Sequence, residues 1–253
     1  MIVRYSSHHS GCPSTDMLIN LWERVPGPLV WDPLGRQIAS FMTIINKPVS
    51  PGGNVLLNPS NPFGSLPQVC PNCFADQRDL DRMIEGVRFM CSLLTEKPVS
   101  QLITDIVIPK PNSLTTMLLQ ENFRAKLISA AGSIALGGPG WLRRRMLKKT
   151  SNPVLNILGD AEATARLILA QTSPTTHPAG TCRLGRPDQR EAVTDFRCRV
   201  IGVEGLRVVD ASIFPTLMTA GLNLPVIMAA EKAAQMAVED RRKTSPAAVV
   251  KTV

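Results

Sequence analysis

The chain has 253 residues, 44% of them hydrophobic and 19% charged, so it can bury a core in one or two domains and is not disordered throughout. Its formal charge of +8 permits contact with nucleic acid, an anionic membrane or an acidic cofactor, but selects none of them. Aromatic residues make up only 4%, and no helix-turn-helix, zinc-finger or RNA-binding signature accompanies the charge, so we expect no nucleic-acid binding.

Six cysteines are present, and the first residues contain no continuous apolar segment, so we expect free thiols in a cytoplasmic protein. Cys70 and Cys73 have CxxC spacing, but they lie in a Pro/Asn-rich loop without two further ligands at matching spacing. We therefore expect incidental loop cysteines and no metal site. No apolar run approaches the roughly 18 residues that span a bilayer, so we expect no membrane association.

In the first third of the chain, the first 35 residues show little periodicity. Residues 38–45 are apolar and partly β-branched, which predicts a buried strand. A turn over 47–53 precedes a second short strand at 54–57. Residues 58–73 hold four prolines, which predicts a loop.

Two helices are predicted most clearly. Residues 76–94 place apolar side chains at helical spacing, and Asp76 or Asp79 can cap the start. Residues 160–170 show the same periodicity. A third helix is expected at 224–238, which is rich in alanine.

Between and after these helices the pattern is weaker. Residues 113–136 are weakly helical, and the Gly-rich stretch 137–140 breaks the chain. The basic residues at 143–149 are interpreted as a solvated loop. Residues 207–209 predict a strand. Helices, short strands and long connections together favour an α+β fold with a mostly antiparallel sheet flanked by helices.

Three polar residues of the last third are candidates for chemistry. His177 lies on a Pro/Gly-bounded loop, where acid–base histidines are common, although a lone histidine is more often structural. Asp210 ends the predicted strand and could accept a hydrogen bond from a ligand hydroxyl, or it could cap a turn or helix. Asn223 could cap the last helix, with Pro225 in its first turn.

The sequences around these residues are HPAGTCRLG at 177–185, GVEGLRVVDASIFPT at 202–216 and N-x-P-x-I-M-A-A-E-K-A-A at 223–234. In this order and spacing they resemble the C-terminal signature of the glucose–methanol–choline (GMC) flavin oxidoreductases. VRYSS at 3–7, the P-x-S-x-G-x-V-x-L-like strand at 47–57 and the helix after Phe74 resemble the family's substrate domain. The resemblance runs from about residue 3 to about residue 240.

This resemblance implies an alcohol oxidation in which hydride passes from the carbinol carbon to flavin N5. A histidine at the position of His177 would be the base. Asp210 and Ala211 would bind FAD, and Leu222 and Asn223 would pass along the isoalloxazine. The chain would be a C-terminal portion, or fragment, with an alcohol as substrate, and it would hold FAD only if an N-terminal FAD-binding half is supplied.

The resemblance also suggests a division of the chain. We expect an entry segment, a substrate-binding domain, a strand and helix that complete an FAD-binding domain, and a disordered basic tail, at residues 1–45, 46–195, 196–240 and 241–253.

Two features depart from the family pattern. Gly221 stands where the family has a second active-site histidine or asparagine, and glycine offers no side chain to hydrogen-bond an alkoxide. The dinucleotide-binding GxGxxG turn is absent, since Gly137 to Gly140 lack its spacing and Pro139 removes a backbone donor. The alternative is therefore a truncated, non-catalytic remnant or binding module, and whether the chain alone is an enzyme stays open.

Overall fold

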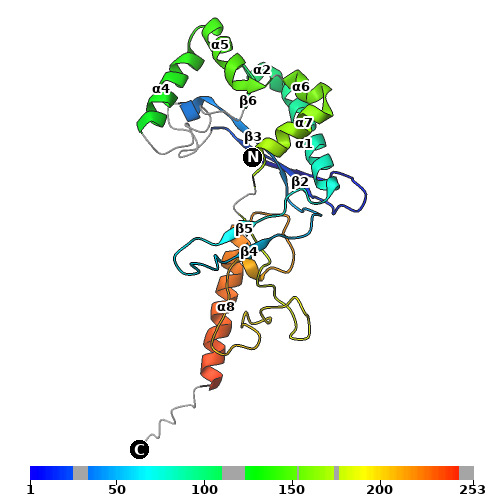
Figure 1. Ribbon diagram of the computed structural model, residues 1–253, viewed down its shortest axis with the longest axis vertical. Coiled ribbons are helices and arrows are strands. Elements are labelled where there is room, and N and C mark those ends of the chain that lie inside the picture. The colour runs from blue at the N-terminus through cyan, green and yellow to red at the C-terminus, as the bar shows by residue number, and fades with distance from the viewer. Residues whose placement is uncertain (25–33, 110–122, 153, 174–176, 245–253) are drawn as a thin grey trace, which may run out of the picture. The chain divides into compact units, whose positions relative to one another are not determined.

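The computed structural model describes residues 1–24, 34–109, 123–152, 154–173 and 177–244 (Figure 1). The chain forms two compact units. The first comprises residues 1–51 and 74–173, and the second comprises residues 52–73 and 174–253. The domain boundaries expected after residues 45 and 195 stay predictions.

The first unit contains a three-stranded antiparallel sheet in the order β1-β2-β3, with bounds Ile2–Tyr5, Met17–Trp22 and Ser40–Ile45. Met17 in the central strand pairs with both Tyr5 and Ile45, which fixes the register. The strand predicted at 38–45 is confirmed as β3, but the expectation that it is buried is wrong, because all its residues are only half-buried. The other two strands were not predicted, because β1 is a short, mostly exposed edge and β2 has apolar residues on both faces.

Helix α1 (Gln77–Thr95) packs against β3. Asp76 is its N-cap, and its carboxylate accepts the backbone N–H of Arg78 at 3.0 Å, as one of the two predicted caps. Met83, Cys91 and Leu94 are buried at helical spacing. The predicted helix at 76–94 is therefore confirmed.

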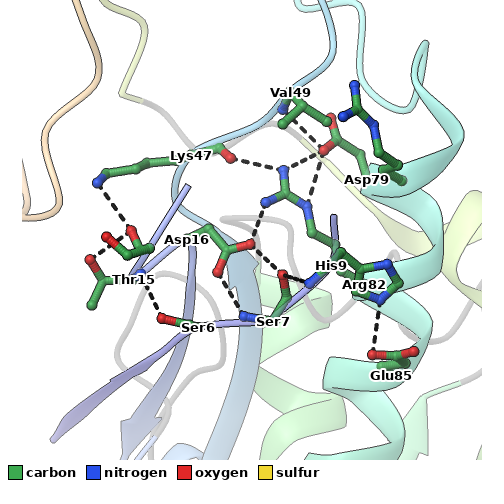
Figure 2. A network of polar contacts seen from close by, with 12 residues as sticks. Ser6, Ser7, His9, Thr15, Asp16, Lys47, Val49, Asp79, Arg82 and Glu85 are labelled. Carbon is green, nitrogen blue, oxygen red and sulfur yellow. Dashed lines mark hydrogen bonds and ion pairs between the residues drawn. The ribbon is translucent and has the colours of Figure 1, made fainter. Parts of the chain in front are cut away.

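Three charged residues form a buried network beneath the start of α1 (Figure 2). Arg82, Asp16 and Asp79 are each at most 1% exposed. The Arg82 guanidinium donates from Nη1 to Asp16 Oδ2 at 2.6 Å and from Nε to Asp79 Oδ1 at 3.1 Å. Ser7 donates its N–H and its hydroxyl to Asp16, at 2.8 and 2.6 Å, and Ser50 donates its N–H to Asp79 at 2.9 Å. The network thus joins α1 to the segments that flank β2 and follow β3.

Hydrogen bonding decides the ionisation of both carboxyl groups. Burial opposes their ionisation, but the bonds from Ser7 and Arg82 hold the pKa of Asp16 below its ordinary value. Burial is likewise outweighed at Asp79 by the bonds from Ser50, Val49 and Arg82, and its pKa is lowered too. Both side chains are therefore carboxylates at neutral pH.

At Gly86, α1 lies close to side chains of the sheet. A Cβ placed there would lie 2.7 Å from the Tyr5 hydroxyl, 2.8 Å from Thr43 Cγ2 and 3.0 Å from Met17 Cε. Alanine would gain helix propensity, but the neighbours would have to move in a packed core.

We therefore expect Gly86→Ala to lower the free energy of unfolding by about 1–2 kcal/mol, since overpacking exceeds the propensity gain. Urea unfolding would measure this loss. Gly137→Ala, at a helical site with no atom within 4 Å, is the matched control and should cost nothing. Equal stability of the two variants would contradict close packing at Gly86.

The remaining elements of the first unit are η1 (Leu34–Gln37), α2 (Val99–Leu102), β6 (Ile108–Pro109), α4 (Phe123–Gly137), α5 (Gly140–Thr150), β7 (Ser151–Asn152), α6 (Val154–Gly159) and α7 (Ala161–Gln171). Strands β6 and β7 pair antiparallel. The helix predicted at 160–170 is confirmed as α7, and Asp160 caps it through the N–H groups of Glu162 and Ala163.

The region around the Gly-rich break is only partly as predicted. The break lies between α4 and α5, as expected, and residues 123–136 are helical. Residues 113–122 of the weak helix lie outside the described residues. The loop predicted at 143–149 is wrong, because these residues belong to α5. Arginine, lysine, leucine and methionine all favour helices, and the basic run concealed this propensity.

The second unit begins with a short antiparallel hairpin of β4 (Asn54–Leu56) and β5 (Gln68–Cys70). The strand predicted at 54–57 is confirmed. The loop predicted at 58–73 is wrong for β5, because Pro67 and Pro71 flank this strand without interrupting it.

The rest of this unit surrounds a small core that contains η2 (Ala211–Ile213) and α8 (Asn223–Thr244). Its buried members are Cys198, Ile213, Phe214, Leu222 and Ala233. The third predicted helix is confirmed as α8, which also includes residues 241–244 of the expected tail, while residues 245–253 lie outside the described part. The strand predicted at 207–209 is wrong, because in the described part of the chain Arg207 forms a single bridge, with Arg199, and no strand.

Helices and small antiparallel sheets together confirm the predicted α+β class. Among the helices that the structure describes, none has the length and apolar character needed to cross a membrane.

Candidate active site

The loop that carries His177 is attached to η2 by its backbone. Three N–H groups of this loop donate to three successive carbonyls: Gly180 to Ala211 at 3.3 Å, Cys182 to Ser212 at 2.9 Å and Leu184 to Ile213 at 2.8 Å. These bonds place the segments 177–185 and 210–214 side by side, although they are far apart in the sequence. His177 itself is exposed and forms no hydrogen bond or ion pair with another described residue.

Gly180 allows this close approach. Its φ of +81° lies in the left-handed region, and a Cβ there would lie 3.2 Å from the Phe214 carbonyl oxygen. Gly202 has a similar φ of +80° but no atom within 4 Å of its Cβ position. The two glycines therefore differ in contact with a neighbouring segment and not in backbone conformation.

We expect Gly180→Ala to destabilise the second unit by about 1–2 kcal/mol, the usual cost of a left-handed alanine, and in addition to push the loop away from Phe214. Gly202→Ala has the same cost of a left-handed alanine but should not displace the loop. Chemical denaturation would compare their stabilities, and amide hydrogen exchange at Cys182 and Leu184 would report on the loop. Unchanged exchange in Gly180→Ala would show that the contact does not hold the loop.

Thr194 also holds the loop by hydrogen bonds. Its side chain is fully buried, and Oγ1 donates to the Cys182 carbonyl at 2.9 Å. Its own carbonyl accepts the N–H of Gly185 at 2.9 Å. Sequence reasoning missed this residue because it lies in a polar stretch without periodicity. No local pattern marks it.

Asp210 is the N-cap of η2. One carboxylate oxygen, Oδ1, accepts the N–H of Ser212 at 2.8 Å and also its hydroxyl. The capping alternative for this residue is therefore confirmed, and its expected place at the end of a strand is wrong. Asp210 is exposed, and its second oxygen forms no hydrogen bond within the described part of the chain. The carboxylate can still accept a hydrogen bond from a ligand.

Leu222 and Asn223 form the start of α8. The Leu222 carbonyl accepts the N–H of Val226 at 2.9 Å, so Leu222 has the N-cap position and Asn223 is the first helical residue. The expectation that Asn223 is the cap is wrong, and the placement of Pro225 in the first turn is confirmed. The N–H groups of Asn223 and Leu224 precede the first helical hydrogen bond, so they can donate to a ligand.

Gly221 precedes this helix start and is exposed. A Cβ at this position would meet no atom within 4 Å. A Cβ therefore fits there without displacing its neighbours.

All three candidate segments rest on the same core. Ala179, Val209 and Ala211 pack against it, and Leu222 is one of its buried members. His177, Asp210 and Asn223 are each within two residues of such an anchor. The structure thus brings the three sequence-predicted segments together in one unit, with their polar side chains on its surface.

Ion pairs fix the far end of α8. Asp240 accepts from Arg197 at 2.8 Å and from Arg207 at 2.5 Å. These hydrogen bonds lower the pKa of Asp240 to about 2. The helix is therefore held at its start by the core and near its end by the loop of residues 195–207.

The described residues contain neither a candidate metal site nor a disulfide bond. They contain no group of three or more His, Cys, Asp or Glu side chains that could hold a metal ion. All six cysteines are free, and Cys70 and Cys73 are exposed.

The segments of the candidate site lie within a region that matches a known protein family. The sequence profile described as GMC oxidoreductase matches residues 48–230, most of the chain. The chain belongs to the GMC oxidoreductase family. Members of this family carry out FAD-dependent oxidation.

Individual proteins are also similar to this chain. The 5-(hydroxymethyl)furfural oxidase of Methylovorus sp. (strain MP688) is 35% identical over 198 residues, which are 78% of this chain and 30% of that protein. The mitochondrial choline dehydrogenase of Homo sapiens is 38% identical over 132 residues, 52% of this chain and 21% of that protein. A formate oxidase structure from Aspergillus oryzae RIB40 has a TM-score of 0.61 at 22% identity, over 92% of this chain and 33% of its own. This chain thus spans a third or less of each relative.

Proposed function

We propose that this chain is the C-terminal portion of an FAD-dependent GMC oxidoreductase that oxidises a primary or secondary alcohol, with His177 as the base. The observation that carries the proposal is the meeting of the segments 177–185, 210–214 and 221–223 on one core. The names of two relatives, 5-(hydroxymethyl)furfural oxidase and choline dehydrogenase, each contain an alcohol, which supports this substrate class.

The residues present fit part of an FAD site. Asp210 has a carboxylate oxygen available for a hydroxyl of the cofactor, and Ala211 adjoins it. The N–H groups of Asn223 and Leu224 can donate to a polar edge of the ring system. When bound, FAD supplies the acceptor for the hydride of the alcohol. An N-terminal half is the proposed source of the remaining cofactor contacts.

His177 would take the proton of the substrate hydroxyl. Histidine suits this role because it can accept and release a proton near neutral pH. Its exposed position leaves the imidazole accessible to a substrate bound on the surface of this unit. Gly221 has no side chain to donate a hydrogen bond, so side-chain stabilisation of the alkoxide must come from other residues.

The second candidate is a non-catalytic remnant or binding module, and Gly221 favours it. In that case the segments would keep their packing, while His177 would contribute nothing to turnover.

Absorption spectroscopy tests the proposal. We expect the purified chain to stay colourless after incubation with excess FAD and desalting. Joined to the FAD-binding part of the Methylovorus relative, it should retain a yellow flavin band that an alcohol bleaches without oxygen. Flavin retained by the chain alone would contradict the need for another half. A yellow chimera that no alcohol bleaches would favour the non-catalytic alternative.

A further inference from the structure

Helix α4 buries its small side chains and exposes its large apolar ones. Its inner face consists of Ala125, Ser129 and Ser133, which are 0%, 0% and 7% exposed. Its outer face carries Phe123, Leu127 and Ile134, which are 73%, 55% and 74% exposed. A water-facing helix normally has the opposite arrangement, so this outer face suits an apolar or interfacial partner.

Helix α5 follows directly and packs against α4 (Figure 1). Its exposed face holds Trp141, Arg144, Arg145 and Lys148, at the i, i+3, i+4 and i+7 positions of one helical stripe. Arg144, Arg145 and Lys148 have no ion-pair partner among the described residues. Trp141 is 64% exposed.

The charge of this region has one sign. Residues 122–159 contain no Asp or Glu, while seven cations lie in it: Arg124, Lys126, Arg143, Arg144, Arg145, Lys148 and Lys149. Arg143 pairs with Asp105 at 2.6 Å, whereas Arg144, Arg145 and Lys148 have no ion-pair partner in the described part of the chain. Exposed apolar side chains and these three cations thus occur together on the two helices, which we call the α4–α5 hairpin (Phe123–Thr150).

We propose that the α4–α5 hairpin attaches the protein to the surface of a membrane that contains anionic lipids. Phenylalanine, leucine, isoleucine and tryptophan enter the boundary between headgroups and acyl chains, and arginine and lysine bind the anionic headgroups. A second copy of the chain fits poorly, since it would bring two cationic faces together. The hairpin lies on the bilayer without crossing it, consistent with the described helices.

This inference goes beyond the proposed oxidation and does not depend on it. The expectation of no membrane association came from the lack of a long apolar run, which concerns spanning and not surface attachment. The decisive features are the orientation of the α4 side chains and the helical stripe of α5, which the sequence did not predict.

Co-sedimentation of the full chain with vesicles tests the proposal. We expect binding to vesicles of phosphatidylcholine mixed with phosphatidylglycerol and not to phosphatidylcholine alone, with affinity falling as salt rises. Arg144→Glu with Arg145→Glu should weaken binding about thirty-fold or more, since each cation near an anionic surface contributes about fivefold. Arg242→Glu with Lys243→Glu on α8 is the charge-matched control and should bind like the native chain.

The apolar face has its own variants. Phe123→Ser with Ile134→Ser should abolish binding even at low salt, and Leu169→Ser, at an exposed site on α7, should not. Tryptophan emission should shift to the blue with anionic vesicles, and Trp141→Phe should remove the shift. Absence of vesicle binding, an equal loss in the α8 control, or a dimer that Phe123→Ser dissociates would each overturn the proposal.

Discussion

Replacing Arg82 with methionine is expected to lower the free energy of unfolding by about 3–5 kcal/mol, the usual cost of breaking a buried ion pair from one side. The variant leaves Asp16 and Asp79 buried without the guanidinium that opposes their charge. The serine and backbone donors that remain satisfy hydrogen bonds, but they carry no net positive charge. Urea unfolding followed by circular dichroism measures the loss.

Two comparisons separate the loss of charge compensation from loss of packing. Arg78→Met removes a partly exposed arginine one helical turn earlier, whose ion pair with Asp76 is partly solvent-accessible, and should change stability little. Adding Asp16→Asn and Asp79→Asn to Arg82→Met removes the uncompensated charges and should restore part of the stability. If the triple variant is no more stable than Arg82→Met, charge is not the cause.

The effect of Arg82→Met should also depend on pH. The native pKa values of Asp16 and Asp79 lie below the ordinary value of 3.8, so their contribution to stability is present above that pH and is lost as the pH falls through the lowered values. Without Arg82, burial favours the protonated forms of Asp16 and Asp79. Lowering the pH protonates them and so removes the uncompensated charges that destabilise the variant. The stability gap between native and variant chains should therefore narrow as the pH falls below 3.8. A gap that stays constant would argue against the network.

Replacing His177 with alanine should have the largest effect on catalysis. In the chimera with the FAD-binding part of the Methylovorus relative, we expect turnover of an alcohol to fall by about 10²–10⁴, as for loss of a general base. Flavin content and the stability of the chain should not change, because His177 is exposed and has no described partner. Stopped-flow measurement of flavin reduction by the alcohol isolates this step from reoxidation.

His9→Gln is the control for a histidine outside the site, since His9 pairs with Glu85 in the first unit. Gly221→Asn is the complementary change: it restores a hydrogen-bonding side chain where a Cβ has open space, and it should raise the rate of flavin reduction. Unchanged reduction in His177→Ala would remove this residue from the mechanism and favour the non-catalytic alternative.

Local signals sufficed for the long helices. Asp76 was recognisable as one of two possible caps, with Asp79, because a cap bonds to N–H groups two or three residues away. The apolar period of α1 follows from the helix itself. The order of the motifs around His177 and Asp210 likewise indicated the family, which the profile over residues 48–230 confirmed. The α+β class followed from the same elements.

Tertiary structure decided what depends on distant partners. Arg82 meets Asp16 across 66 residues, and β2 obtains its register from two neighbouring strands. Within the described residues, the apolar run before Asp210 pairs through a single bridge, between Arg207 and Arg199, and Asp210 caps η2. The burial of Thr194 and the exposure of Phe123 likewise could not be predicted from the sequence. Burial is a property of the neighbours, which local propensity does not contain.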